Sequence, residues 1–493
     1  MTTHTGRIGG TIPDEARQIL YGASIDALLP QLPAYLQVDR AHIVMLVEAE
    51  LLDHPRAAAL LAAIAELERS GFAGLRGRPT PRGLYLAYEQ YLIEQTGPNV
   101  GGMLQLGRSR NDLQATLALL RQRETVAVVL AELLHLIESV IGKAREHARV
   151  LMPAYTHGQP AVPITLGHYL AGIAEALVRD ADGVHGAALG LTRCPLGAGA
   201  VGGTTLPIRP DRTATLLGFE LPLVNSVDAV ASRDTALRLL ASCAVAGTTL
   251  SRFSQDLLGW LGDVGFFELP DELVGSSSMM PQKRNPYFLE HVQGRAGRPL
   301  GAFVAACTAM HAKPFTNSIA VGTEGTAELE GALESLRTAL VLLRLVVLGA
   351  RPRPERMARR AEEGFVQATE VATRLARHLG FRQAHAVVGQ AITEALEGGA
   401  TLPDVLGARL MELGLPAELA AVSPSDVVAA AEHLGGPGPR AVEKALDRLA
   451  ELLQERRLRL ADMRRAWDSA RGELAAAVDR IRKAADGAAK RVG

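Results

Sequence analysis

The feature that most limits the possible fold is a series of long, apolar-periodic segments between about residues 113 and 350. They are rich in Ala, Leu and Val, and proline-containing breaks interrupt them. Apolar residues that recur every three or four positions predict amphipathic helices. Long helices with many small apolar residues suit a closely packed bundle. The sequence therefore predicts a central bundle of long helices.

The composition favours helix throughout the chain. Hydrophobic residues make up 48% of the 493 residues and aromatic residues only 4%, and few aromatics and few β-branched runs favour helix over sheet. The length is enough for two or three domains. Beyond residue 440, heptad-like apolar positions predict a helix or helical hairpin packed against a neighbour. These positions are Leu460, Met463, Trp467, Ala470, Leu474, Ala477, Ile481 and Ala484.

The charge balance and the cysteines exclude several classes of protein. A formal net charge of -1 implies no nucleic-acid or anionic-membrane partner. Cys194, Cys243 and Cys307 lack paired spacing, so we expect buried thiols in a reducing compartment. Residues 1–7 lack an apolar core and predict no signal peptide. No apolar stretch of transmembrane length is expected either. The prediction is a cytoplasmic protein with no membrane partner, whose excess apolar surface lies between subunits.

The segment of residues 275–286, GSSSMMPQKRNP, carries the clearest chemistry. Three serines after a glycine disfavour a helix interior, because their hydroxyls compete for backbone hydrogen bonds. They suit a mobile loop, and Pro281 and Pro286 bound its turn. Lys283 and Asn285 add a cation and an amide, so the segment can hold a carboxylate and stabilise developing negative charge. By composition alone, a serine-rich surface loop is the simpler interpretation.

A second stretch, GRSRND at residues 107–112, stands before a predicted helix. Arg108 and Arg110 flank Ser109, and Asn111 follows. Arginine offers a planar fork for a carboxylate, and a helix N-terminus adds N–H groups and a favourable dipole. Taken alone, a surface arginine cluster is the more usual interpretation.

A third stretch, residues 153–165, is stiffened by prolines. Thr156 places a hydroxyl beside the His157 imidazole, which fits substrate binding and proton transfer near neutral pH. A His-Gly-Gln-Pro loop is an unusual place for a packing histidine, whereas His168 is interpreted as structural. The glycines of residues 197–205 lack the strand–turn–helix frame of a nucleotide site.

These stretches together resemble a known superfamily. The 275–286 segment resembles the GSSxMPxKxNP motif of the fumarase/aspartase superfamily, with one extra serine at its start. The other two stretches resemble the argininosuccinate lyase branch in order and spacing. So do residues 197–208, 225–229 and 361–369. The resemblance covers roughly residues 25–440, and the tail beyond looks like an extension.

The resemblance implies an all-α fold of three helical domains. The expected domains are residues 1–108, residues 109–360 with the catalytic loop 275–286, and residues 361–493 with extended charged helices at 440–487. The central domain would assemble as a homotetramer around a core of roughly 20 helices. Each active site would combine the three regions from three different subunits.

The resemblance also implies residue roles. Counting back from Met280 places the general base on Ser277, although the extra serine keeps Ser276 and Ser278 as alternatives. Lys283 would grip a substrate carboxylate. His157 would orient or protonate the leaving side, with Glu290 at the spacing of its partner glutamate. The substrate-binding residues would be Ser109, Arg110, Asn111, Thr156, Gln159, Ser278, Met280, Asn285, Lys313 and Asn317. No metal or organic cofactor is expected.

The implied reaction is the reversible anti elimination of fumarate from an N-substituted L-aspartate, a small dicarboxylate. The branch usually carries a Leu-Ala-Tyr-Asn-x-Asp-x-Gln tract that contacts the arginine end, whereas residues 313–324 here lack its tyrosine. A guanidinium left without partners binds poorly. We therefore expect an aminopolycarboxylate-type substrate, as in the ethylenediamine disuccinate lyases of this family, with Lys313 and Asn317 as contacts. The alternatives are a true argininosuccinate lyase of arginine biosynthesis and a non-catalytic, crystallin-like structural protein.

Overall fold

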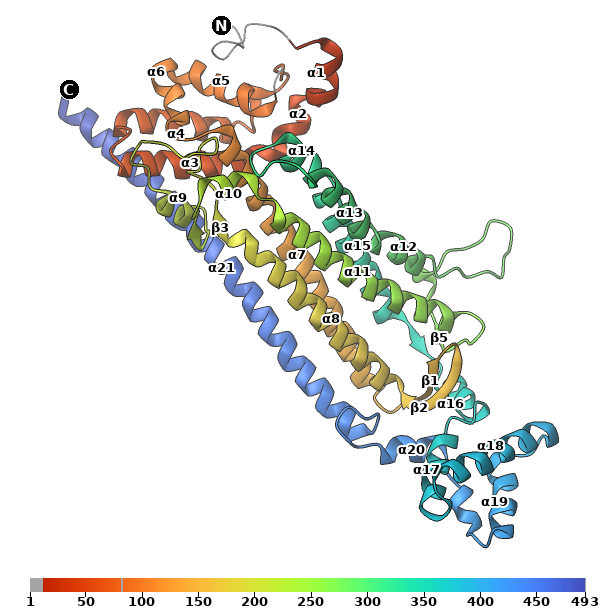
Figure 1. Cartoon of the computed structure of the whole chain (residues 1–493). Coiled ribbons are helices and arrows are strands. Elements are labelled where there is room, and N and C mark those ends of the chain that lie inside the picture. Colours follow the sequence, from red (N-terminus) through yellow and green to blue (C-terminus); the bar gives the residue numbers. More distant parts are fainter. Residues whose placement is uncertain (1–11, 81–82, 493) are drawn as a thin grey trace.

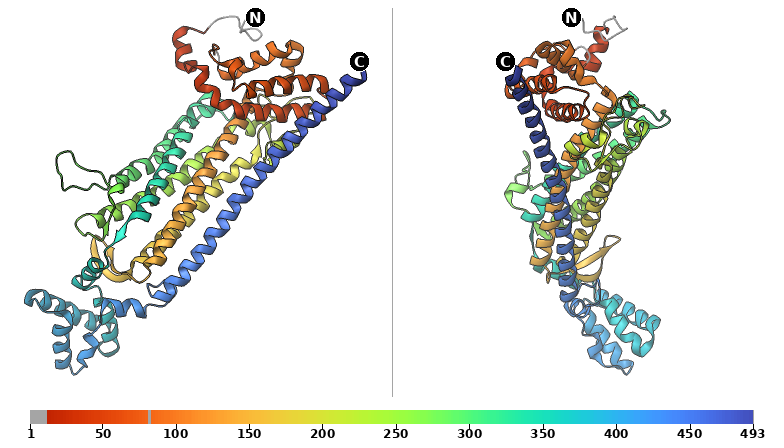
Figure 2. Two further views of the ribbon diagram at one scale, coloured as in Figure 1. Left: turned by 180° about the vertical axis from the view of Figure 1, so that it is seen from behind. Right: turned by 90° about the vertical axis from the view of Figure 1, so that its left-hand side faces the viewer.

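The computed structural model describes residues 12–80 and 83–492 (Figure 1). Residues 1–7, on which the signal-peptide prediction depends, lie outside this range. The all-α prediction is confirmed, because long helices dominate and the sheets of the described part are two-stranded. An N-terminal helical body and a C-terminal helical body lie at opposite ends of an elongated bundle (Figures 1 and 2).

The central bundle is built from long helices that lie side by side (Figure 1). They are α7 (Arg110–Glu146), α8 (Leu166–Ala188), α11 (Asp234–Leu261), α12 (Tyr287–Ala296), α13 (Arg298–Met310) and α15 (Leu329–Gly349). Their buried apolar residues form one large cluster. Each of these helices turns an apolar face inward, so packing stabilises helices that would be marginal alone.

Helix α7 corrects one expectation from the sequence. With a mean hydropathy of 1.8 over its most apolar 18-residue window, α7 is long and apolar enough to cross a membrane. Within the protein, however, 56% of that window is buried, and the helix packs against α8 and α15. A bundle core accounts for this apolarity, since core helices of soluble proteins pass the same test.

The N-terminal body packs around a second apolar cluster at the start of α7. Its helices are α1 (Asp14–Tyr21), α2 (Ile25–Leu28), α3 (Leu32–Glu48), α4 (His54–Arg69), α5 (Leu84–Thr96) and α6 (Pro98–Gly101). Two short helices, α9 (Pro210–Leu216) and α10 (Ser226–Ala231), lie at the same end of the bundle. Cys194 and Cys243 are buried as expected, whereas Cys307 is partly exposed.

The C-terminal body has a small apolar core of its own. Its helices are α17 (Ala368–Leu379), α18 (Phe381–Gly398), α19 (Leu402–Glu412) and α20 (Pro424–Ala430), and α16 (Pro354–Glu363) leads into it. The short strand pairs β3 (Arg193–Cys194) with β4 (Leu221–Pro222), and β5 (Phe267–Glu268) with β6 (Arg351–Pro352), tie loops together.

The last helix, α21 (Pro439–Val492), is one continuous helix of 54 residues and not a hairpin. It runs back along α7 and α8 to the N-terminal body (Figure 2). The heptad-like positions from Leu460 to Ile481 are buried apart from the half-buried Met463, whereas Ala484 is exposed. Arg456 pairs with Asp182 at 2.6 Å and fastens the helix to α8. The division at residues 108 and 360 stays a prediction, and α21 packs into the cores of both other bodies.

A β-hairpin follows α7 and was not predicted from the sequence. Strand β1 (Leu151–Thr156) pairs antiparallel with β2 (Gln159–Thr165). The turn residues His157 and Gly158 both have positive φ, at 53° and 75°, as a tight two-residue hairpin turn requires. Prolines are tolerated because a two-stranded sheet has only edge strands. The hairpin packs against α16, and Gly364 lies against Pro160.

Candidate active site

The first region is the N-terminus of α7. Ser109 caps the helix, and its hydroxyl accepts a hydrogen bond from the N–H of Asn111 at 3.3 Å. The Asp112 carboxylate accepts from the N–H of Ser109 at 2.9 Å, which completes a capping box. The Arg110 side chain is exposed beside this turn. A cation and a helix N-terminus therefore stand together, as the sequence predicted.

Asp112 is a key residue that the sequence analysis missed. Its buried carboxylate also accepts hydrogen bonds from the N–H groups of Gly197, at 3.1 Å, and Gly199, at 2.8 Å. Burial raises the pKa of Asp112, while these backbone N–H groups act in the opposite direction. Asn111 Nδ2 donates to the carbonyl of Ala200 at 2.9 Å. The glycine run thus folds over the first turn of α7 and supports it. The Ser-x-x-Asp spacing of the capping box was the signal that could have found this residue.

Arg108 does not share the role predicted for the two arginines. Its side chain is fully buried and pairs with Asp39 of α3 at 2.5 Å. A surface arginine cluster, the more usual interpretation of the two residues, was therefore wrong for Arg108, and a role in carboxylate binding is left to Arg110. Arg108 precedes the helix cap and points into the N-terminal body, where Asp39 neutralises it. Only Arg110 is exposed for a ligand.

The second region is the tip of the β1–β2 hairpin. Thr156, His157 and Gln159 are all exposed there. The positive φ of His157 is uncommon for a residue other than glycine, although histidine adopts it more readily than most. The His157 side chain is thus exposed on a tight turn and is free to meet a ligand.

The third region is the loop between η5 (Asp271–Leu273) and α12. Gly275 and Asn285 exchange two backbone hydrogen bonds of 2.8 Å and close the neck of the loop. Beyond this neck the chain projects from the bundle (Figure 1). Arg284 anchors the base by donating to the carbonyl of Leu269 at 2.7 Å and by pairing with Asp271. The loop is therefore fixed at its base and extended at its tip.

Within this loop, Ser277 differs from its two neighbours. Its Oγ accepts hydrogen bonds from the N–H groups of Met279, at 3.3 Å, and Met280, at 3.0 Å. Ser277 is half-buried, while Ser276 and Ser278 are exposed. Hydrogen bonds donated to an oxygen stabilise its ionised form. This geometry supports Ser277 over the alternatives as the base.

The remaining predicted residues of this region lie in the loop itself and in the first turn of α12. Lys283 and Met280 are exposed. Asn285 is half-buried at the neck, with its Nδ2 3.5 Å from the carbonyl of Ser276. Glu290 is exposed in the first turn of α12. Among the described residues, no hydrogen bond or ion pair joins Glu290 to His157 within one chain.

Lys313 and Asn317 lie in the segment between α13 and α14 (Ile319–Gly322). Lys313 is exposed and Asn317 is half-buried. Gly322 lies next to the guanidinium of Arg233, since a Cβ there would be 3.4 Å from Nη2. Figure 1 places α14 and α10 at the end of the bundle that carries the start of α7. The segment that holds Lys313 and Asn317, the predicted contacts of the amine, therefore lies at the same end of the bundle as the first region.

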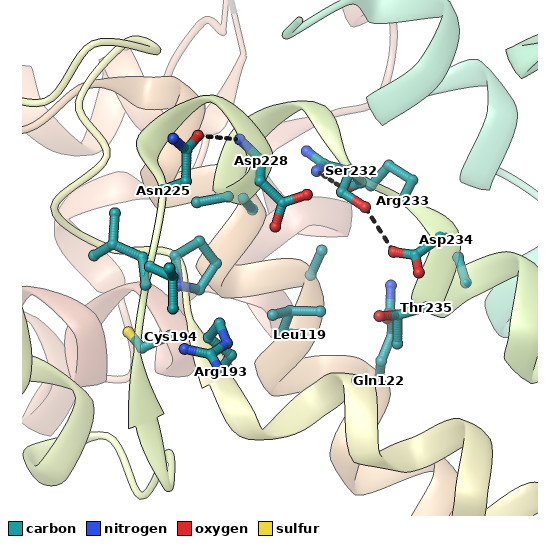
Figure 3. A pocket seen from close by; sticks show the side chains of 18 residues that line it. Leu119, Gln122, Arg193, Cys194, Asn225, Asp228, Ser232, Arg233, Asp234 and Thr235 are labelled. Atoms are coloured by element: carbon teal, nitrogen blue, oxygen red, sulfur yellow. Dashed lines mark hydrogen bonds between the residues drawn. The ribbon is translucent and has the colours of Figure 1, made fainter. Parts of the chain in front are cut away.

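A cavity of about 100 Å³ lies close to the first region (Figure 3). Residues of α7, of the chain before α9, of α10 and of the start of α11 line it, and none of them is a predicted site residue. The half-buried Arg233 donates to the carbonyl of Ser232 at 2.6 Å. Burial lowers the pKa of Arg233. The stretch of residues 225–229 lines this cavity, and Asn225 caps α10 there.

The first and second regions do not meet within one chain. Helix α7 has 37 residues, which at 1.5 Å per residue separates its start from the following hairpin by about 55 Å. Ser109 and His157 therefore lie near opposite ends of the bundle. The expectation that each active site combines regions from different subunits therefore stays a prediction. In the described residues no group of three or more His, Cys, Asp or Glu side chains could hold a metal ion, and the absence of a cofactor stays a prediction.

Comparison with known proteins identifies the family. A lyase family profile matches residues 82–301, and the argininosuccinate lyase C-terminal profile matches residues 365–431. Argininosuccinate lyase 1 of Shouchella clausii is 31% identical, over 94% of this chain and 96% of its own. Argininosuccinate lyase of Methanoculleus marisnigri is 35% identical, over 94% of each chain. The chain belongs to the argininosuccinate lyase-like branch of the fumarase/aspartase superfamily. It is a carbon–nitrogen lyase, and the crystallin-like alternative is set aside.

Solved structures extend the comparison for this lyase. EDDS lyase in complex with formate superposes with a TM-score of 0.85 and 30% identity, covering 97% of both chains. An EDDS lyase variant with bound fumarate gives 0.85 and 31%, covering 98% of this chain and 99% of that one. A class II fumarase of Schistosoma mansoni shares the fold, at 19% identity and a TM-score of 0.69. Because the first two matches cover almost all of the chain, its last 50 or so residues are not the extension that was expected.

Proposed function

We propose that this lyase reversibly releases fumarate from an N-substituted L-aspartate whose amine part carries a further acidic group. The observation that supports this substrate class is the charge around residues 311–324, where the amine part of the substrate is predicted to bind. Lys313 stands in residues 311–324 with one carboxylate, Glu324, and the guanidinium of Arg233 adds a second cation beside Gly322. Cations at this end repel a guanidinium and attract a second carboxylate. The EDDS lyase structures that superpose on this chain support the same class.

The proposed mechanism begins with proton removal by the deprotonated Oγ of Ser277, whose negative charge the N–H groups of Met279 and Met280 stabilise. The C–H bond beside a substrate carboxylate breaks, the proton passes to the serine oxygen, and the carboxylate gains a second negative charge. Lys283 and Asn285 hold that carboxylate, and a well-placed donor can supply about 3 kcal/mol of such stabilisation. The C–N bond then breaks, its electron pair stays on nitrogen, and His157 supplies the proton, with Glu290 as its partner. The products are fumarate and an amine.

The proposed assembly is a homotetramer with shared sites. Three regions that lie apart in one chain become neighbours when the bundles of several chains pack together. Apolar side chains stay exposed on the bundle helices in the single chain, among them Val245 of α11 and Leu300 and Val304 of α13. An exposed apolar helix face of this kind marks a protein–protein interface. The superposed lyases share the bundle that would form this core.

A second candidate function is a true argininosuccinate lyase. The observation in its favour is the name of the relatives, which are 31% and 35% identical over 94% of this chain. This candidate shares the chemistry and the fumarate half of the site with the first. The two differ only in the amine that the segment around Lys313 receives.

A direct comparison of substrates tests the proposal. Argininosuccinate and ethylenediamine disuccinate are supplied at equal concentration, and fumarate release is followed by its absorbance. We expect a higher kcat/KM for ethylenediamine disuccinate, and no release from either by Ser277→Ala. A much higher kcat/KM for argininosuccinate would overturn the substrate class and leave the lyase assignment in place. The reverse reaction, fumarate with a panel of amines, then identifies the product amine.

A further inference from the structure

The N-terminal body contains a fully buried ion pair. Asp39 of α3 and Arg108 lie 2.5 Å apart, and both side chains have no exposed surface. Tyr88 donates to the second oxygen of Asp39 at 2.7 Å, and Arg108 donates to the Tyr85 hydroxyl at 3.3 Å. Burial by itself would lower the pKa of Arg108, but the Asp39 charge and these hydrogen bonds raise it. The guanidinium is therefore held as a cation inside the protein.

This ion pair adjoins the fumarate half of the site. Arg108 directly precedes Ser109, the cap of α7. One turn after Asp39 on α3, His42 Nε2 lies 2.9 Å from the carbonyl of Leu106. Burial and the charge of Arg108 lower the pKa of His42, so its neutral ring donates this hydrogen bond. One face of α3 thus holds the backbone on the N-terminal side of the cap.

A buried ion pair is a costly way to gain stability. Removing two charges from water costs several kcal/mol per ion, and apolar replacements are often neutral or stabilising. Such a pair fixes geometry well, because a guanidinium and a carboxylate bind in few orientations. Asp112 already anchors the helical side of the cap through the glycine run. The Asp39 pair supplies the matching anchor on the other side.

We propose that Asp39 is a positioning residue for fumarate binding, acting through Arg108 to fix Ser109 and Arg110. It touches no substrate, and its effect reaches the site along three consecutive residues. This inference rests on the proposed function, which assigns Ser109 and Arg110 to the dicarboxylate. A misplacement of about 1 Å can cost about 100-fold in rate. Because Ser109 and Arg110 are assigned to holding the dicarboxylate, loss of the anchor acts through weaker substrate binding.

The test uses the full-length enzyme and the variant Asp39→Asn. The substituted side chain keeps its size and can still accept from Tyr88, but it no longer neutralises Arg108. We expect KM to rise about tenfold or more with a smaller change in kcat, since the anchor acts on binding. Arg108→Lys is a second variant, which keeps the positive charge but lacks the planar guanidinium that binds a carboxylate in a fixed orientation. Glu68→Gln is the matched control. It breaks the 2.5 Å ion pair between Glu68 and Arg40, and Arg40 follows Asp39 directly in α3.

A double-mutant cycle with Arg110→Ala separates positioning from general destabilisation. If Asp39 acts through the Arg110 turn, its substitution raises KM less in the Arg110→Ala background; independent effects would add. Additive effects, or folded variants with wild-type KM, would overturn the inference. If Asp39→Asn does not fold, Arg108→Lys decides by the same measurements. An unchanged KM in Arg110→Ala itself would instead refute the proposed binding site.

Discussion

Replacing each of the three loop serines by alanine is the sharpest test of the proposed mechanism. The extra serine allows the base to be Ser276, Ser277 or Ser278 by sequence alone. Only Ser277 Oγ accepts two backbone hydrogen bonds, of 3.3 and 3.0 Å, from the described part of the loop. We therefore expect Ser277→Ala to remove the base, and Ser276→Ala and Ser278→Ala to retain it.

The expected size of the effect follows from the role of the residue. A positioned general base contributes about 100-fold to 10,000-fold to rate, so Ser277→Ala should lower kcat by at least about 100-fold. That loss corresponds to about 2.7 kcal/mol of transition-state stabilisation. Ser276→Ala removes an exposed hydroxyl and should change kcat by no more than about fivefold, whereas Ser278→Ala, at a predicted substrate-binding residue, should raise KM more than it lowers kcat. Stability should change little, because the loop tip projects from the bundle (Figure 1).

The assay is steady-state fumarate release, with the oligomeric state and thermal midpoint of every variant measured in parallel. A low kcat in a folded, fully assembled Ser277→Ala enzyme supports the assignment. Near-normal kcat in this variant, together with a large loss in Ser276→Ala or Ser278→Ala, would move the base to the other serine. The hydrogen bonds to Met279 and Met280 would then be only a turn-stabilising feature of the loop.

Three further predictions concern support and assembly of the site. Asp112 accepts from four backbone N–H groups, and Asp112→Asn leaves two of them without an acceptor. At about 1.5–3 kcal/mol for each lost hydrogen bond, the free energy of unfolding measured by urea denaturation should fall by about 3–6 kcal/mol. A loss below about 1 kcal/mol would contradict the anchoring role. Val304→Glu charges an exposed apolar face of α13 and should give smaller, inactive species in light scattering, whereas an intact active oligomer would place the interface elsewhere. Mixing inactive Arg110→Ala and Ser277→Ala subunits should restore partial activity, because some mixed sites carry neither change; no recovery after verified exchange would argue against shared sites.

The sequence by itself determined the helical class and the local chemistry. Long apolar-periodic segments predicted the bundle, because a helix shows its buried face in the spacing of its own residues. The loop of residues 275–286 could also be predicted, since its glycine, serine and proline residues disfavour a helix. The cap at Ser109 and the packed face of α21 followed from the same short-range rules. Each of these features depends on residues a few positions apart.

Only the tertiary structure decided which distant groups meet. Arg108 was interpreted from the sequence as part of an exposed arginine cluster, but its partner is the buried Asp39, 69 residues away. Asp112 gained its role from glycines 85 and 87 residues further on. The β1–β2 hairpin was likewise unpredicted, and the choice between one helix and a helical hairpin for α21 was left open. Side-chain type and spacing carry no record of such partners, because long-range contacts are set by the packing of whole helices. That packing also places the predicted site residues Ser109 and His157 near opposite ends of the bundle.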